Sequence, residues 1–413
     1  MLQLPCGRGS ERGCGSERER LPRSERGREG APQASGPCYV VSRRYAAFFR
    51  MRPAALALAL WAGPLSAQRW QLQYFYDRQK SSLAITDIAF STASQGVAVG
   101  VIRNGKRDQP TAVVTSDGGA HWQLAPLKET PVALFLLNQD LGWMATDNGI
   151  WRTSDGGKSW IKLTKMKPPI LRVYFANEQR GWAVGAMKTV LETNDGGAHW
   201  SPVPAAAEPK TKPQNTAYNW ITFASPEAGL ITGLSIPPEQ FSSRPPEWYD
   251  PGASRRQEAP HLSVSLDTTD GGKTWRSSSA SLFGEVTRVR FQQYRMGLSL
   301  VEFSQAFDWP SEVYRFYPAT NRNERVYREK DRAISDIWLT SSGTAYLTGT
   351  EVIGRLRAAV PSKVKVLKSD DYSKWDEMDV DYRAVANRTI IASADDHNLW
   401  LATDTGMILK LVE

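Results

Sequence analysis

A box of eight residues recurs along this chain and constrains its fold more than any other feature. It reads T-S-D-G-G-x-x-W with small variations at residues 115–122, 153–160, 193–200 and 268–275, and a degraded copy occupies residues 368–375. The first three copies follow one another at a spacing of about 40 residues. A repeat of this length in a chain rich in predicted strands indicates a stacked or radial array, most often a β-propeller.

The chemistry of the box is that of a tight hairpin loop. The two glycines supply the positive φ angles of a short turn, and the aspartate can accept hydrogen bonds from nearby backbone N–H groups. The tryptophan offers a large apolar face at the start of the next strand. A catalytic or metal-binding role is disfavoured, because equivalent acids spread around a ring cannot converge on one centre. We therefore predict structural turn staples at Asp117 and Trp122, Asp155 and Trp160, Asp195 and Trp200, Asp270 and Trp275, and Asp370 and Trp375.

A second repeat sets the number of blades. Runs of small and apolar residues, typical of buried strands, start near residues 96, 142, 181, 229, 297, 344 and 398, and we interpret them as the second strands of seven blades. The last blade lacks a fourth strand at the C-terminal end. Residues 69–72 read Arg-Trp-Gln-Leu and match the His-Trp-Gln-Leu of residues 121–124, where a fourth strand begins. We predict an all-β, seven-bladed β-propeller closed by residues 68–76, which removes open sheet edges.

The first 67 residues differ from the rest. Residues 1–50 are rich in arginine, contain no lysine and hold all three cysteines. Such a segment is either a disordered basic arm, suited to nucleic acid, or the product of a start site assigned too far upstream. We favour the second reading, because residues 51–67 have the basic start, apolar run and small final residue of a secretory signal peptide. The propeller would then occupy residues 68–413.

This division sets expectations for location and partners. A chain beginning at Gln68 contains no cysteine, and we expect it in the periplasm or secreted. The full chain has a formal net charge of +8, but most of the excess lies in the arginine-rich leader, so bulk charge does not indicate a nucleic-acid partner. The apolar run is too short to span a membrane. We expect a monomer that binds a protein complex or an anionic polymer.

Loops opposite the boxes are the predicted partner-binding site. They are rich in cations, which would concentrate an anionic partner around the channel mouth, although loops are also where solvated charges ordinarily lie. The longest, residues 237–260, adds prolines and aromatic residues, the composition of an interaction hot spot. A lid packed on its own propeller is the alternative interpretation of that loop. The candidate residues are Arg103, Arg107, Trp248, Tyr249, Arg255, Arg256, Arg355 and Arg357.

No motif of a known catalytic site is visible. The sequence contains no H-E-x-x-H, nucleophile elbow, P-loop or dinucleotide fingerprint, and the Arg-Ile-Pro motif usual in sialidases does not occur. We therefore predict no enzymatic activity, no cofactor and no metal. A sequence does not reveal carboxylate pairs, so a sialidase-like or other glycoside hydrolase stays as the alternative. Two carboxyl groups about 5–10 Å apart at the channel mouth would favour that alternative.

The box, combined with strands that read G-W-[AM]-[VT], resembles the Asp-box (BNR-like) repeat of bacterial propellers related to the photosystem II stability and assembly factor. The resemblance covers residues 68–413 and is strongest over 84–204. It implies a seven-bladed, non-enzymatic propeller that helps to assemble or stabilise a partner complex and carries a basic patch on one face. The chain departs from the family pattern in blade five, which has no box, and in its long proline-rich loop.

Overall fold

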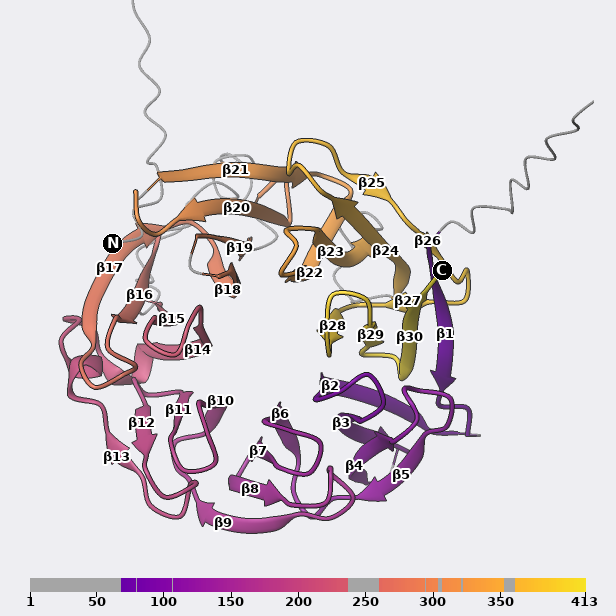
Figure 1. The fold of residues 1–413 in the computed structure, drawn as a ribbon, viewed down its shortest axis with the longest axis horizontal. Coiled ribbons are helices and arrows are strands. Elements are labelled where there is room, and N and C mark those ends of the chain that lie inside the picture. Colours follow the sequence, from indigo (N-terminus) through magenta and orange to yellow (C-terminus); the bar gives the residue numbers. More distant parts are fainter. Residues whose placement is uncertain are drawn as a thin grey trace, which may run out of the picture. The chain divides into compact units, whose positions relative to one another are not determined.

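Seven small sheets surround a central axis in this computed structural model (Figure 1). The structure describes residues 68–413 except 79, 106, 237–259, 294, 304–306, 321 and 353–360. Six sheets are built from consecutive stretches of chain, and the seventh combines strands from both ends of the described chain. The predicted all-β, seven-bladed β-propeller is therefore confirmed.

The first three blades contain short strands in simple chain order from the axis outward. Blade 1 consists of β2 (Ser82–Phe90), β3 (Gly96–Arg103), β4 (Asp108–Thr115) and β5 (Gln123–Pro126). Blade 2 consists of β6 (Pro131–Leu136), β7 (Gly142–Thr146), β8 (Gly149–Thr153) and β9 (Ile161–Lys165). Blade 3 consists of β10 (Ile170–Phe175), β11 (Gly181–Gly185), β12 (Val190–Thr193) and β13 (Ser201–Pro202).

The next three blades follow the same order. Two short 3-10 helices, η1 (Pro204–Ala207) and η2 (Pro213–Asn215), connect blade 3 to blade 4. Blade 4 consists of β14 (Thr216–Phe223), β15 (Gly229–Ser235), β16 (His261–Thr268) and β17 (Arg276–Leu282). Blade 5 consists of β18 (Glu285–Gln292), β19 (Met296–Glu302), β20 (Ser311–Tyr317) and β21 (Arg322–Glu329). Blade 6 consists of β22 (Arg332–Leu339), β23 (Ala345–Glu351), β24 (Ser362–Ser369) and β25 (Asp376–Glu377).

Blade 7 closes the ring with a strand from the N-terminal side. Its inner strands are β28 (Thr389–Ser393), β29 (Leu399–Thr403) and β30 (Met407–Val412), and its outer strand is β1 (Arg69–Phe75). β1 runs antiparallel to β30, with Arg69 opposite Val412 and Phe75 opposite Met407. The short strand β26 (Asp379–Val380) pairs in parallel with the start of β1, and β27 (Val385–Ala386) pairs with β24. The predicted closure by residues 68–76 is therefore confirmed.

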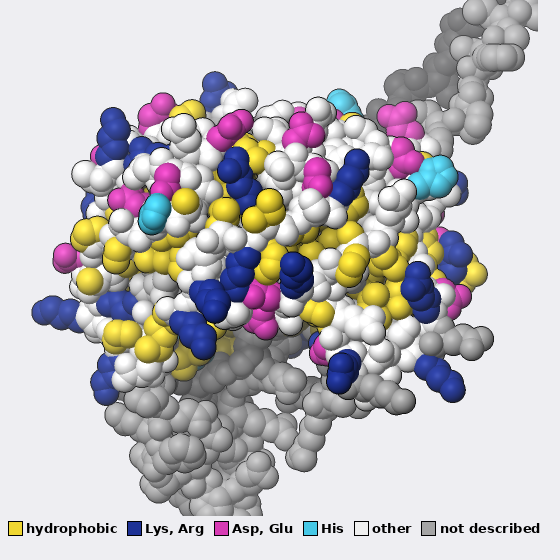
Figure 2. Space-filling view, turned by 90° about the horizontal axis from the view of Figure 1, so that it is seen from below, with side chains coloured by type: hydrophobic (Ala, Val, Ile, Leu, Met, Phe, Trp, Pro, Cys, Tyr) yellow, Lys and Arg dark blue, Asp and Glu magenta, His cyan; other side chains and the backbone are white. Residues whose placement is uncertain are grey.

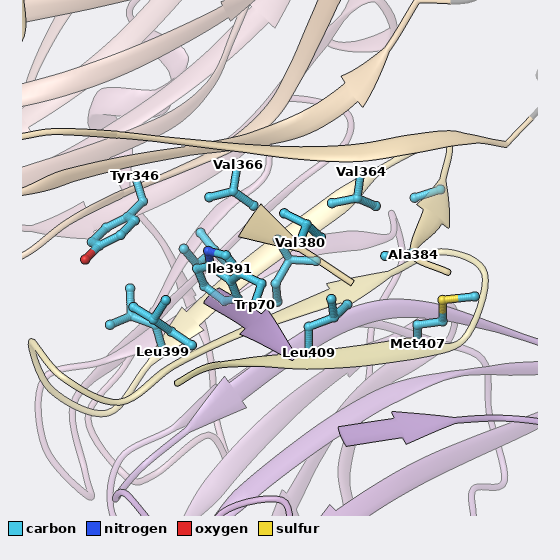
Figure 3. Packing of buried hydrophobic residues seen from close by; sticks show 13 residues of the cluster. Trp70, Tyr346, Val364, Val366, Val380, Ala384, Ile391, Leu399, Met407 and Leu409 are labelled. Atoms are coloured by element: carbon cyan, nitrogen blue, oxygen red, sulfur yellow. The ribbon is translucent and has the colours of Figure 1, made fainter. Parts of the chain in front are cut away.

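A buried cluster between blades 6 and 7 shows why the closing strand matters (Figure 3). Trp70 of β1 is 1% exposed and packs with Val364 and Val366 of blade 6 and with Leu409 of β30. Its ring also lies 6.5 Å from that of Tyr346, edge to face. Burial of a tryptophan contributes several kcal/mol to folding, so the first strand is part of the core.

Neighbouring blades are joined by aromatic side chains from the second strands. Trp143 of blade 2 stacks on Phe175 of blade 3 at 3.6 Å, and its indole N–H donates to the carbonyl of Gly196 in the blade 3 box at 2.9 Å. Trp400 of blade 7 stacks on Phe90 of blade 1 at 3.5 Å in the same way. The boxes thus lie against the preceding blade, where close approach requires glycine. A Cβ added at Gly272, which has φ 79°, would lie 2.4 Å from the ring of Trp182 in blade 3.

The ring has two distinct faces. Because strands alternate in direction, loops between first and second strands lie on the same face as the boxes between third and fourth strands. Hydrogen bonds confirm this, since the N–H of Gly118 donates to the carbonyl of Ser94 at 2.8 Å. We call this side the box face. The opposite face carries the loops between second and third strands and the connections between blades.

Candidate functional site

The innermost strands of blades 1 to 6 share a bulge near their middle. In each, the register with the second strand shifts at one residue: Thr86, Val132, Leu171, Asn219, Thr287 and Ser335. A bulge redirects the side chains beside it. The residues that follow the bulges occupy equivalent positions around the axis, and we call them the channel layer: Asp87, Ala133, Arg172, Trp220, Arg288 and Asp336.

Asp87 connects three blades within this layer. Its Oδ1 accepts a hydrogen bond from the N–H of Ile88 at 3.1 Å. Its Oδ2 accepts from the N–H of Leu134 in blade 2 at 2.8 Å and from Nη1 of Arg172 in blade 3 at 2.6 Å. The side chain is only 5% exposed. Because blade 2 lies between blades 1 and 3, this ion pair bridges the inner edge of blade 2.

Asp336 of blade 6 makes a similar set of bonds, with an arginine of the neighbouring blade 5. Its Oδ1 accepts from the N–H of Ile337 at 2.8 Å and from Nε of Arg288 in blade 5 at 3.2 Å. Its Oδ2 accepts from the N–H of Ile391 in blade 7 at 3.1 Å. Asp336 is 1% exposed and Arg288 is 13% exposed. Two buried carboxylates thus fix one arginine each.

Three guanidinium groups gather around the indole ring of Trp220. The Cζ atoms of Arg172, Arg288 and Arg290 lie 4.7, 4.8 and 5.2 Å from the ring centroid. Arg290 also lies over the ring of Trp338, at 4.5 Å. Cation–π attraction favours this geometry. The two tryptophans hold three like charges close together at the axis.

Arg290 is the member of this cluster without an acidic partner. Its Nε donates to the carbonyl of Ile337 at 3.2 Å, and among the described residues it forms no ion pair. Burial lowers the pKa of Arg290 to about 10, so the guanidinium stays charged at neutral pH. The other two arginines are matched by the carboxylates of Asp87 and Asp336. The layer itself is therefore balanced in charge, and Arg290 beside it adds one positive charge that no ion pair among the described residues matches.

A second polar cluster lies where β18 and β19 reach the opposite face. Glu285 and Glu302 stand opposite each other in this strand pair. Arg388 donates to both oxygens of Glu302, at 2.8 and 3.0 Å, and the hydroxyl of Thr287 donates to Oε1 at 2.7 Å. Burial raises the pKa of Glu285, although a hydrogen bond from Asn219 opposes this effect.

This carboxylate pair does not support the hydrolase alternative. A retaining glycosidase needs one carboxylate free to attack the sugar, and an inverting one needs a carboxylate that holds a water. Both oxygens of Glu302 are already bound by Arg388, and one of them also by Thr287. Within the part of the chain that the structure describes, no group of three or more His, Cys, Asp or Glu side chains is placed to hold a metal ion.

The four full boxes share one set of hydrogen bonds. In the first, the hydroxyl of Thr115 and the N–H of His121 both donate to Oδ1 of Asp117, at 2.9 Å each. The same two bonds recur at Asp155, Asp195 and Asp270. In the first box, hydrogen bonds from the backbone and ring of His121 lower the pKa of Asp117 to about 2. These contacts all lie within the loop and support a structural role for the box aspartates. That role stays a prediction.

The box tryptophans lie between loop and sheet. The indole N–H groups of Trp160 and Trp200 donate to the carbonyls of Gly157 and Gly197, at 3.0 and 2.9 Å. Trp122 packs edge to face on Phe90, with ring centroids 6.0 Å apart. Trp275 does the same on Trp182, at 6.1 Å. Their surroundings are those of packing residues.

In the fifth box, the aspartate that holds the turn is Asp371, one residue after the predicted Asp370. Asp371 accepts hydrogen bonds from the N–H groups of Ser373 and Lys374, at 2.8 and 2.9 Å. Tyr372 follows it with φ 63°, the left-handed conformation that the first glycine has in the full boxes. Asp370, the predicted staple, instead accepts from the hydroxyl of Thr344 at 2.6 Å. The alignment on Asp370 is displaced because this loop is one residue shorter than the others. Trp375 keeps its place and donates to a carbonyl of β21 at 2.9 Å.

Of the predicted partner-binding residues, the structure describes two. Arg103 ends β3 and Arg107 lies in the loop that follows, where its N–H donates to Oδ1 of Asn104 at 3.0 Å. Both side chains are exposed on the opposite face. The other candidates lie outside the described residues: Trp248, Tyr249, Arg255, Arg256, Arg355 and Arg357. All of these assignments stay predictions.

Sequence reasoning missed the channel layer, although a signal was present. Each layer residue is followed by an apolar residue, a variable one and a phenylalanine or leucine. The motif reads Asp-Ile-Ala-Phe at 87–90, Arg-Val-Tyr-Phe at 172–175, Trp-Ile-Thr-Phe at 220–223, Arg-Val-Arg-Phe at 288–291 and Asp-Ile-Trp-Leu at 336–339. Alignment of the first strands on this motif would have brought the acids and arginines to one level of the channel.

The chain is similar to proteins that assist photosystem II assembly. A family model described as photosynthesis system II assembly factor YCF48 matches residues 163–236. The photosystem II assembly lipoprotein Ycf48 of Prochlorococcus marinus is 24% identical over 293 residues, which cover 65% of this chain and 84% of that protein. The protein of the same name from Trichormus variabilis is 24% identical over 250 residues, covering 56% and 69%.

Solved structures with this fold include two of the same kind. YCF48 bound to a D1 peptide has a TM-score of 0.54 at 15% identity, covering 82% of this chain and 99% of that one. YCF48 from Cyanidioschyzon merolae has a TM-score of 0.54 at 13% identity, covering 84% and 98%. An ancestral GH74 enzyme has a TM-score of 0.50 at 11% identity, and 46% of its chain is covered. At these identities the structural likeness shows the fold alone.

Proposed function

We propose that this chain, an Asp-box β-propeller that resembles the photosystem II assembly factors, is a non-enzymatic scaffold that binds a protein partner during assembly of a complex. The observation that carries the proposal is the uncompensated Arg290 among three arginines at the channel axis. The named sequence relatives, which are assembly lipoproteins, support a binding protein rather than an enzyme.

The arginine cluster around Trp220 suits a carboxylate of the partner. Guanidinium groups bind carboxylates through two parallel N–H···O bonds, and the low dielectric of a partly buried site strengthens them. An acidic side chain or a C-terminal carboxylate of a partner segment would supply the charge that Arg290 lacks. One relative of the same fold is solved with a bound peptide, which supports a peptide segment as the ligand. The predicted residues of the opposite face would form the outer part of this site, with Arg103 and Arg107 at its edge.

The test is capture of a partner by the wild-type chain and by an Arg290→Gln variant. Glutamine keeps a donor for the carbonyl of Ile337 but removes the charge. We expect the variant to keep its melting temperature and to lose the partner from a native extract. Arg322→Gln is the matched control, because Arg322 is 72% exposed on the outer strand β21. Normal capture by Arg290→Gln would refute the channel as the binding site.

We also propose export to the periplasm or beyond, with residues 51–67 as the signal peptide and residues 1–50 outside the mature protein. Support comes from the signal-like sequence and from the relatives, which are named as lipoproteins. In the described residues, the structure contains no helix of sufficient length and apolarity to cross a bilayer.

A further inference from the structure

The outer strands of the blades differ in how their free edges are protected. A free edge offers N–H and C=O groups to any other strand, and natural sheets limit such pairing with short strands, prolines, charged side chains or bulges. β13 and β25 contain two residues each, and β5 contains four and ends in Pro126. β9 carries Lys162 and Lys165. Figure 2 views the rim from the side of Figure 1 on which β9 lies, and lysine and arginine side chains are scattered over the surface there.

Two of the longer outer strands are protected as well. Charged side chains dominate β21, and its register with β20 shifts between Val313 and Tyr314. The first two residues of β1 pair with β26, and its register with β30 shifts between Leu72 and Tyr74. Both strands are therefore poor templates for a further strand.

Among the described outer strands, β17 of blade 4 has none of these features. Its seven residues read Arg-Ser-Ser-Ser-Ala-Ser-Leu, with no proline and no charged side chain after Arg276. It pairs with β16 at all seven positions without a shift in register, from Asp267 opposite Arg276 to His261 opposite Leu282. Residues 260–284 are all described, and among the described strands only β16 pairs with β17. Figure 1 shows β17 on the outside of the ring, so its second edge faces outward.

The side chains of β17 would let another backbone approach closely. All residues from 277 to 281 are serine or alanine, and Ser279 and Ser281 are exposed. The hydroxyl oxygens of Ser278 and Ser265 lie 2.7 Å apart, so serine already pairs with serine across this sheet. The edge thus offers backbone hydrogen bonds without the apolar area that would favour unspecific aggregation.

The sequence of β17 is complementary to itself. Antiparallel pairing of two copies, with Ser279 on the two-fold axis, would pair all seven residues of each strand. The pairs around the axis would be Ser278 with Ala280, Ser277 with Ser281 and Arg276 with Leu282. The two cations would then lie at opposite ends of the contact, and each is also bound by Asp267 of its own copy, at 2.8 Å. Association of a surface with itself about a two-fold axis is the commonest arrangement of identical chains.

We propose that two copies of this chain form a weak dimer through antiparallel pairing of their β17 strands. The four-stranded sheets of the two blades 4 would join into one continuous sheet. A second copy fits better than an unrelated segment, because the edge matches itself in register and carries no charge between residues 277 and 281 that would select another sequence. The dimer replaces the monomer expected from the sequence. It goes beyond the scaffold function, since a contact at the rim leaves both faces of each ring uncovered.

Site-specific disulfide formation tests the contact and its register. The background is the full chain with Cys6, Cys14 and Cys38 replaced by serine. Ser279→Cys would place the two thiols opposite each other, with Cα atoms about 4.5–5.5 Å apart, which a disulfide can bridge. Ser281→Cys is the matched control, because its two copies would lie about 13 Å apart in this register. We expect mild oxidation to convert most of the Ser279→Cys chain, and little of the Ser281→Cys chain, into a covalent dimer. Equal cross-linking at both positions, or none at 279, would overturn the proposal.

Sedimentation equilibrium gives an independent measure without cysteines. The wild type should shift from monomer towards dimer as its concentration rises. Ser279→Lys would bring two like charges face to face and should weaken dimerisation about tenfold or more, whereas Ser281→Lys would face a serine and should weaken it less. Arg290→Gln should dimerise like the wild type whatever its effect on partner capture, which separates the two proposals. A wild type that stays monomeric at every concentration would show that the edge does not pair with itself.

Discussion

Each full box depends on one aspartate whose bonds are all local. Asp155 accepts from the hydroxyl of Thr153 at 2.8 Å and from the N–H of Ser159 at 2.9 Å. We expect Asp155→Ala to lower the free energy of unfolding by about 1 kcal/mol, the usual loss of a side chain that satisfies turn N–H groups. Chemical denaturation measures this. Partner capture by the folded variant should be unchanged, and a stable variant that loses capture would contradict the staple role.

The fifth box offers an internal comparison between adjacent aspartates. Asp371 satisfies two N–H groups of its own loop, whereas Asp370 accepts from one hydroxyl, that of Thr344. We therefore expect Asp371→Ala to lower the melting temperature more than Asp370→Ala does. The opposite order in thermal melts would restore the predicted alignment on Asp370.

Glu129 is expected to make the folded protein less stable as the pH becomes acidic. Burial alone would raise its pKa, but hydrogen bonds from Lys162, Thr146, Trp151 and Asn148 lower it to about 2. Because the folded pKa is below the unfolded one, this stabilisation is fully present above the ordinary glutamate pKa of about 4.3 and is lost as pH falls towards 2. The difference in unfolding free energy between wild type and Glu129→Gln should shrink over that range. A difference independent of pH would contradict the assignment.

At this scale the sequence predicted local roles better than long-range ones. The boxes could be recognised because the aspartate and glycines act within one loop. The pairing of Asp87 with Arg172 joins residues 85 positions apart and depends on bulges in two strands, which no local pattern specifies. The partly buried Glu129 likewise looks like any solvated loop acid in the sequence.

Among the strands, β1 is the one whose contribution to stability is easiest to test. Trp70 fills the cluster between blades 6 and 7, so Trp70→Ala should cost about 3–5 kcal/mol of stability. Deletion of residues 68–76 should expose the edge of β30 and cause aggregation or a large fall in melting temperature. Size-exclusion chromatography and thermal melts check both. A monomeric deletion variant with unchanged melting would refute closure by β1.

The seven second strands could be predicted because they are buried on both sides and read as continuous apolar runs. The outer strands could not. β13 and β25 contain two residues each, with side chains that face solvent, so their sequences carry no periodic signal. The parallel strand β26 is equally short and pairs with residues more than 300 positions away in the sequence.

For the molecule as a whole, the prediction concerns its length. Export with cleavage after Ala67 should yield a mature chain that begins at Gln68 and contains no thiol, because all three cysteines precede that point. Intact mass spectrometry of the exported protein checks this. A mature chain that retains Cys6 or Cys38 would overturn the assigned location. The predicted partner-binding cations of the opposite face stay a prediction, and no local pattern in the sequence indicated the charge held at the axis.

The pairing of Arg69 with Val412 has a consequence for how the protein is made. The first strand of the ring to be synthesised has no partner until the last one exists, and contacts between such distant parts of a chain form slowly. A chain that ends before β30, through premature termination or proteolysis, would leave β1 without its partner strand. The ring would then stay open. Only a chain that contains both β1 and β30 can close the ring, so the pairing of these two strands separates ring-forming chains from shorter fragments.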